Sequence, residues 1–164
     1  MSTKRRSMYF WAVTLMIAAM LFSACGGGKP GKATIKIGAI HDLTGATAEV
    51  GTPYAEGLKA YIEWMNENDG VDGHPLELLS DNYAYKVDRA EQLYSQYVQQ
   101  GVAAFMGWGT GDTEALRPKV AADKIPFMSA SYSASLLDMS VAPYNFLIGT
   151  SYSDQAIIVL RWAR

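Results

Sequence analysis

The chain has 164 residues, with 16 acidic and 14 basic side chains and a formal net charge of −2. Beyond a cluster at residues 4–6, the basic residues are scattered, which argues against the positively charged surface of a nucleic-acid-binding protein. The single cysteine excludes an internal disulfide, and the length suits one ordinary domain with a hydrophobic core.

The N-terminus has the pattern of an export signal. Lys4, Arg5 and Arg6 precede an uncharged run at residues 8–22, which is too short to span a bilayer comfortably and matches the core of a signal peptide. The ending at residues 21–25 resembles a bacterial lipoprotein processing site. We therefore expect a lipoprotein signal peptide at 1–24 and a lipidated Cys25 opening a flexible glycine-rich tether at 25–33. An ordinary cleaved signal or an uncleaved anchor is the alternative.

The body of the chain alternates segments with strand and helix patterns. Residues 34–40 are rich in β-branched side chains, whereas residues 53–68 repeat apolar side chains at helical spacing. Such alternation predicts an α/β fold, an open and mostly parallel sheet with helices on both faces. The expected strands are 34–40, 75–81, 102–106, 125–129 and 144–148, and the expected helices are 53–68, 87–100, a helix ending near 123, and 153–164.

The stretch at residues 105–120, FMGWGTGDTEALRPKV, places three glycines between a predicted strand and a predicted helix. It lacks the lysine of a P-loop and the glycine spacing of a dinucleotide fingerprint. A helix N-terminus that binds a small polar ligand fits better, since Thr110, Asp112 and Thr113 can cap some N–H groups and leave others for a carboxylate or carbonyl oxygen. Asp112 either contacts a ligand or only caps the helix. Trp108 either lines the cleft or belongs to the core.

Several segments, taken in order, resemble the solute-binding components of ABC importers of the branched-chain amino acid, amide and hydrophobic amino acid type. The resemblance rests on residues 37–45, Gly51, the helix through Asn66, and the segments 70–73, 107–113 and 125–133. It implies a periplasmic-binding-protein-like type I fold of two lobes that close on a ligand. The N-terminal ligand-binding lobe is expected at 34–149. Residues 150–164 would cross the hinge and begin a second lobe that lies mostly beyond the end of this chain; a naturally one-lobed protein is the alternative.

The resemblance also implies which residues meet the ligand. The loops after the third and fourth strands and the segment that leaves the first lobe would supply these contacts. Val50 stands where amino-acid binders of this family usually have a tyrosine, so an aromatic acid, an amide or another small carboxylate is as good a candidate ligand as leucine. The predicted ligand-binding residues are Trp108, Gly109, Thr110, Asp112, Thr113, Ser131, Tyr132, Ser133 and Tyr152.

The implied function is capture of a small molecule and its delivery to an ABC permease with its ATPase subunits, outside the cytoplasm. No enzyme activity, cofactor, metal or nucleic acid is expected. A ligand sensor for a signalling partner is one alternative. A hydrolase is another, because His41 and Asp42 end the first strand and Ser129, Ser131 and Ser133 follow the fourth. However, no nucleophile elbow is present, and two separated histidines offer no recognisable metal spacing.

Overall fold

The structure, a computed structural model, describes residues 32–164. The predicted signal peptide and Cys25 lie outside the described residues. Between residues 32 and 164, no helix combines the length and the apolar character needed to cross a bilayer.

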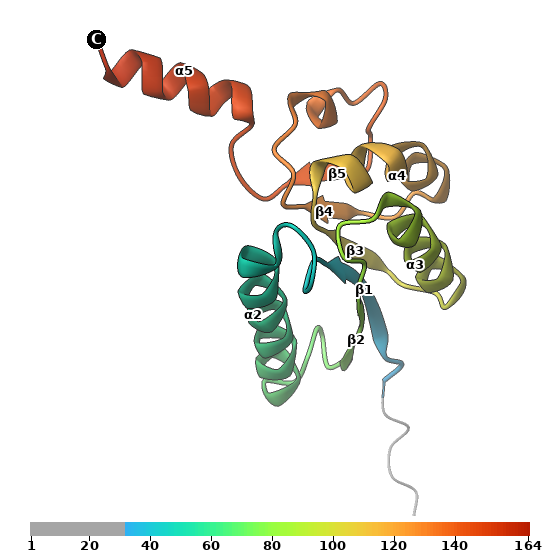
Figure 1. Ribbon diagram of the computed structural model, residues 1–164. Coiled ribbons are helices and arrows are strands. Elements are labelled where there is room, and N and C mark those ends of the chain that lie inside the picture. The colour runs from blue at the N-terminus through green and yellow to red at the C-terminus, as the bar shows by residue number, and fades with distance from the viewer. Residues whose placement is uncertain (1–31) are drawn as a thin grey trace, which may run out of the picture. The chain divides into compact units, whose positions relative to one another are not determined.

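Five parallel strands form one sheet in the order β2-β1-β3-β4-β5 (Figure 1). Because β1 lies between β2 and β3, the strand order reverses beside the first strand, which is the arrangement that places ligands at the carboxyl ends of the strands. The prediction of an open parallel sheet is confirmed. The strands are β1 (Ile35–His41), β2 (Leu76–Asn82), β3 (Ala104–Gly107), β4 (Phe127–Ser129) and β5 (Asn145–Leu147).

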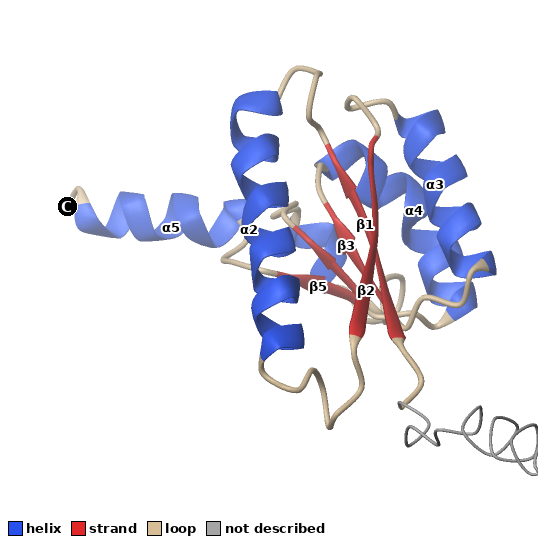
Figure 2. Ribbon diagram, turned by 90° about the horizontal axis from the view of Figure 1, so that it is seen from below, coloured by secondary structure: helices blue, strands red, loops and turns tan. Residues whose placement is uncertain are grey.

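Helices cover both faces of the sheet, as predicted. Figure 2 shows α2 on one face and α3 with α4 on the other. The first helix begins at Ala48 rather than at Pro53, so Pro53 lies inside it. A short 3₁₀ helix, η1 (Ala134–Leu137), was not predicted. The α-helices are α2 (Ala48–Glu67), α3 (Val87–Gln99), α4 (Thr110–Asp123) and α5 (Tyr152–Trp162).

Aromatic side chains dominate the core between the sheet and the α3–α4 layer. Phe105 and Phe127 stack in neighbouring strands, with ring centroids 5.3 Å apart and planes 4° apart. Tyr94 of α3 packs against Phe105 at 5.0 Å. Each of these rings buries a large apolar area, so this layer fixes β3 and β4, whose ends carry much of the site described below.

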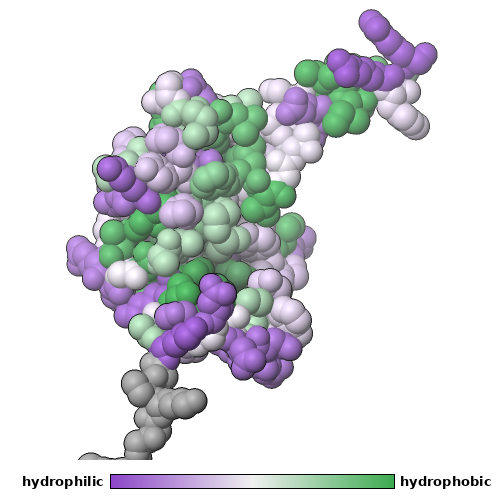
Figure 3. Space-filling view, turned by 180° about the vertical axis from the view of Figure 1, so that it is seen from behind, coloured by the Kyte–Doolittle hydropathy of each residue, from purple (hydrophilic) through white to green (hydrophobic). Residues whose placement is uncertain are grey.

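The last helix differs from the others because none of its residues is buried. Figure 3 shows apolar side chains gathered on it. Ser151 begins the helix: its Oγ accepts the Asp154 N–H at 3.2 Å and donates to the Asp154 carboxylate at 2.6 Å. The role of residues 150–164 as a hinge crossing stays a prediction. The large exposed apolar residues after the first turn are Ile157, Ile158, Val159, Leu160 and Trp162.

Candidate functional site

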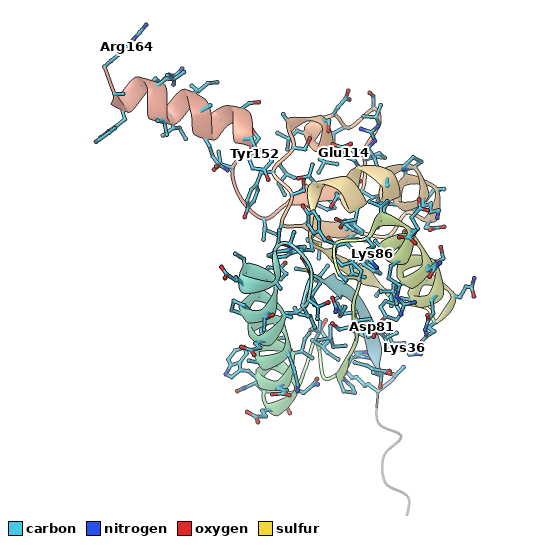
Figure 4. All side chains as sticks on the ribbon, viewed as in Figure 1. Lys36, Asp81, Lys86, Glu114, Tyr152 and Arg164 are labelled. Atoms are coloured by element: carbon cyan, nitrogen blue, oxygen red, sulfur yellow. The ribbon has the colours of Figure 1, made fainter. Side chains whose placement is uncertain are left out.

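A cavity of about 290 Å³ opens at the carboxyl ends of the strands. The segment after every strand contributes to its wall, and so does Tyr152, which lies at the start of α5 (Figure 4). This is the edge at which the fold class predicts a ligand, and the volume approaches the range of small-molecule pockets. The wall consists of Thr47, Val50, Tyr54, Tyr85, Trp108, Gly109, Thr110, Ala130, Tyr132, Ile148 and Tyr152.

The turn from β3 into α4 is held by a buried carboxylate. Asp112 accepts the Gly109 N–H at 3.2 Å and the Tyr83 hydroxyl at 2.7 Å, and it is only 2% exposed. A Cβ at Gly109 would lie 2.5 Å from the Asp112 carboxylate, so this close approach requires glycine. Burial raises the pKa of Asp112 to about 6, against the opposing effect of the Tyr83 hydrogen bond. Asp112 thus caps α4 from behind the cavity wall.

A chain of hydroxyl groups orients the Thr110 side chain. Thr113 donates to the Gly109 carbonyl at 2.6 Å, so Ser129 must donate in its 2.6 Å bond with Thr113. Ser129 in turn accepts the Ser131 N–H at 2.9 Å. Ser131 Oγ then donates to Thr110 Oγ1 at 3.0 Å. Because Thr110 accepts this bond, its own hydroxyl hydrogen remains to be donated, and Thr110 lies in the cavity wall.

Aromatic rings form much of the remaining wall. Tyr54 and Trp108 pack at 5.1 Å, and Tyr132 and Tyr152 meet edge to face at 5.7 Å. The Tyr54 hydroxyl is buried and has no hydrogen-bond partner among the described residues. Tyr85 reaches the wall from a left-handed backbone conformation with φ of 58°. Such conformations cost energy for residues other than glycine and cluster at ligand sites.

The structure divides the nine predicted ligand-binding residues into two groups. Trp108, Gly109, Thr110, Tyr132 and Tyr152 lie in the cavity wall. The other four lie outside the wall and make hydrogen bonds within the protein. They are Asp112, Thr113 and Ser131, whose bonds are given above, and Ser133, whose Oγ donates to Glu114 at 2.9 Å. Ligand contact by any of the nine stays a prediction. The wall residues absent from the prediction are Thr47, Val50, Tyr54, Tyr85, Ala130 and Ile148.

Four of these omitted residues had a signal in the sequence, because they lie in segments that follow predicted strands. Thr47 and Val50 follow the first strand, Tyr85 follows the second and Ala130 follows the fourth. Tyr54 had none, because helical spacing alone does not show that this part of α2 faces the cavity.

His41 offers no catalytic arrangement. It is fully buried, neither ring nitrogen has a hydrogen-bond partner among the described residues, and burial lowers the pKa of the imidazole to about 4. A base that activates serine needs that serine within hydrogen-bond reach. Within residues 32–164, no group of three or more histidine, cysteine or acidic residues could hold a metal ion.

Comparison with known proteins agrees with this arrangement. The family model described as "Periplasmic binding protein" matches residues 34–164. The chain belongs to this family. Membership implies an extracytoplasmic location. No curated protein is similar enough to the chain to count as a match.

Solved structures of periplasmic binding proteins share the fold. An ABC transporter substrate-binding protein from Aeropyrum pernix is 40% identical, with a TM-score of 0.70, over 76% of this chain and 33% of that one. A branched-chain amino acid ABC transporter protein from Thermus thermophilus with bound valine is 26% identical, with a TM-score of 0.77, over 81% and 35%. An ABC transporter solute-binding protein from Rhodopseudomonas palustris BisB5 in complex with 3,4-dihydroxybenzoic acid is 25% identical, with a TM-score of 0.69, over 79% and 36%. The matched region is about a third of each of these relatives.

Proposed function

We propose that this protein is an extracytoplasmic receptor that captures a small organic molecule and delivers it to an ABC import permease and its ATPase subunits. The observation that carries the proposal is the cavity at the carboxyl ends of all five strands, walled by Trp108 and by the start of α4. Membership of the periplasmic binding protein family supports it.

The chemistry of the wall suits a ligand with an oxygen acceptor at one end and an apolar body. The Thr110 hydroxyl has a hydrogen to donate, and the first N–H groups of a helix have no intrahelical acceptor. The positive end of the α4 dipole favours a carboxylate or carbonyl there. The rings of Tyr54, Trp108, Tyr132 and Tyr152 suit the apolar part. The bound valine and 3,4-dihydroxybenzoic acid of the two relatives fit this description, and we propose an amino acid, an amide, or an aromatic or aliphatic carboxylate.

We further propose that Cys25 carries a lipid that anchors the receptor to the membrane. Lipidation requires the cysteine thiol, so Cys25→Ser should lose the incorporation of labelled fatty acid that the original protein shows when a bacterial host expresses the full chain. Equal labelling of the variant, or no labelling of the original, would contradict the lipid anchor and leave the ligand site untouched.

The ligand proposal is tested by the thermal stability of the full chain against a panel of compounds. The panel contains branched-chain and aromatic amino acids, short amides, urea and benzoate-like acids. A ligand at a hundred times its dissociation constant adds about 2.7 kcal/mol to the free energy of unfolding, which gives a clear rise in the midpoint. If no compound raises the midpoint of the folded protein, the assignment of ligand class fails.

Two tryptophan variants locate the binding. Trp108→Ala removes a ring from the cavity wall, whereas Trp64→Ala removes an exposed ring from α2, outside that wall. The ligand-induced rise should disappear in Trp108→Ala and persist in Trp64→Ala. A rise that survives in Trp108→Ala would place the ligand elsewhere.

A further inference from the structure

Trp108 is held by its indole N–H rather than by packing alone. The Nε1 atom donates to Thr47 Oγ1 at 2.8 Å, across the cavity wall from the β3–α4 turn to the start of α2. An indole has only one polar hydrogen. The N–H is therefore occupied, and Trp108 offers the cavity its ring surface.

The Thr47 hydroxyl has only one possible orientation. Thr47 Oγ1 lies 2.8 Å from Asp42 Oδ2 as well as 2.8 Å from the indole nitrogen. An ionised carboxylate only accepts and an indole N–H only donates, so the hydroxyl donates to Asp42 and accepts from Trp108. Thr47 is the residue that precedes α2, where threonine commonly caps the helix, yet its side chain makes no capping bond. Its hydroxyl instead accepts the indole N–H of Trp108.

Asp42 is fixed by the loop that surrounds it. The side chain is fully buried, and it also accepts the N–H groups of Gly45 at 2.5 Å, Thr47 at 2.8 Å and Thr44 at 3.3 Å. Burial raises the pKa of Asp42, but the hydrogen bonds from Thr47, Gly45 and Thr44 together bring it below the ordinary value, so the group is ionised. A Cβ at Gly51 would lie 2.0 Å from the Asp42 carbonyl oxygen, so α2 needs glycine to pack this closely.

We propose that Asp42 is a positioning residue for the ligand site: through Thr47 it sets the plane of Trp108 that the ligand meets. Asp42 itself is not in the cavity wall, so it acts only through these two residues. Since the indole N–H is occupied, the part of the ligand that lies on Trp108 meets the ring surface and takes no hydrogen bond from the indole. This last step rests on the proposed function, whereas the orientation of Trp108 does not.

The indole N–H resonance of Trp108 tests the hydrogen-bond relay from Asp42 through Thr47 to Trp108 without any ligand. Trp108→Phe assigns the resonance in ¹⁵N-labelled protein. Thr47→Val keeps the side-chain shape and removes the hydroxyl; it should shift the resonance upfield and raise its exchange rate with water about tenfold, the factor for one lost hydrogen bond of about 1.4 kcal/mol. Asp42→Asn should shift the same resonance in the same direction, although it does not touch the ring.

Two controls separate the relay from a general effect of mutation. Thr47→Ser keeps the hydroxyl and should leave the resonance near its original position. Thr52→Val makes the same exchange as Thr47→Val five residues later, within α2 and outside the cavity wall, and should also leave the resonance unchanged. An unchanged Trp108 resonance in Thr47→Val or in Asp42→Asn, or an equal shift in Thr47→Ser, would overturn the proposal.

Ligand affinity distinguishes the two proposals. For any compound that binds the unaltered protein, Asp42→Asn should weaken binding about tenfold while Thr52→Val leaves it unchanged. If no compound binds, the proposed function fails and the indole measurement still tests the relay. If a compound binds Asp42→Asn as tightly as the original, Asp42 does not position the site.

Discussion

Tyr83→Phe tests how the N-terminus of α4 is held beside the cavity. Tyr83 and Asp112 are 1% and 2% exposed, and the hydroxyl donates to the carboxylate at 2.7 Å. The substitution removes one oxygen and leaves the ring. A hydrogen bond to a charged partner contributes roughly 1.5–3 kcal/mol, and the buried carboxylate would keep only weaker support from backbone N–H groups.

The cost of Tyr83→Phe should depend on pH. Burial raises the pKa of Asp112 to about 6 in the folded state, above the ordinary value of 3.8. A raised carboxyl pKa means that the folded protein binds the proton more tightly, so the Asp112 contribution to stability increases as pH falls from above 6 towards 4. At pH 8 Asp112 is charged, and the variant should lose roughly 1.5–3 kcal/mol. At pH 5 Asp112 is mainly protonated, and the loss should fall to about 1 kcal/mol, as for a neutral bond.

Urea unfolding of the original and variant proteins at pH 8 and pH 5 measures both losses. Comparing the two proteins at one pH cancels the titration of every other group. Tyr97→Phe is the matched control, because it removes a hydroxyl that donates at 2.6 Å to Asp81, whose side chain is exposed and can be solvated by water. It should cost less than about 1 kcal/mol.

The Asp112→Asn background provides the second check. There the carboxylate is gone, so the pH dependence of the Tyr83→Phe cost should vanish. An equal cost at pH 8 and pH 5 in the original background would refute the reasoning, and so would a pH-dependent cost that persists in Asp112→Asn.

Further substitutions test three single features. Ala84 has a left-handed backbone conformation with φ of 52°, so Ala84→Gly should raise the free energy of unfolding by about 1 kcal/mol. Ala60→Gly, in the interior of α2, is the control and should lower it by about 0.5–1 kcal/mol. Thermal midpoints that move in the same direction in both variants would contradict the prediction. Burial lowers the pKa of His41 from 6.5 to about 4, so the free energy of unfolding should fall by roughly 3 kcal/mol through this group as pH falls from 6.5 to 4. The His41→Phe variant should lack this fall. Parallel curves of stability against pH for the two proteins would contradict the prediction. Ser151→Ala removes the side-chain cap of α5 and should destabilise that helix by about 1 kcal/mol. Hydrogen exchange should show faster exchange of the amides in its first turn. Unchanged exchange rates would exclude a capping role.

The sequence was enough to predict the sheet and the edge at which the cavity lies. Each predicted strand overlaps its observed counterpart, because buried parallel strands carry short apolar runs bounded by turn residues. The cavity position followed from the rule for parallel sheets. The predicted start of α2 at Pro53 was wrong. Proline is common in the first turn of a helix, but here the helix begins at Ala48 and Pro53 lies beyond its first turn. The residues in these early turns include Val50 and Tyr54, which lie in the cavity wall.

Side-chain direction within a turn could not be predicted. Thr110 and Asp112 are two residues apart at the start of one helix, and either is a reasonable ligand contact from its type alone. The structure turns Thr110 to the cavity and Asp112 away from it, because Tyr83, which lies 29 positions earlier in the chain than Asp112, donates to the carboxylate from behind. The orientation of Trp108 likewise depends on Thr47, which is 61 positions away. Local sequence specifies where the helix begins, whereas distant partners decide which of its first residues faces the ligand.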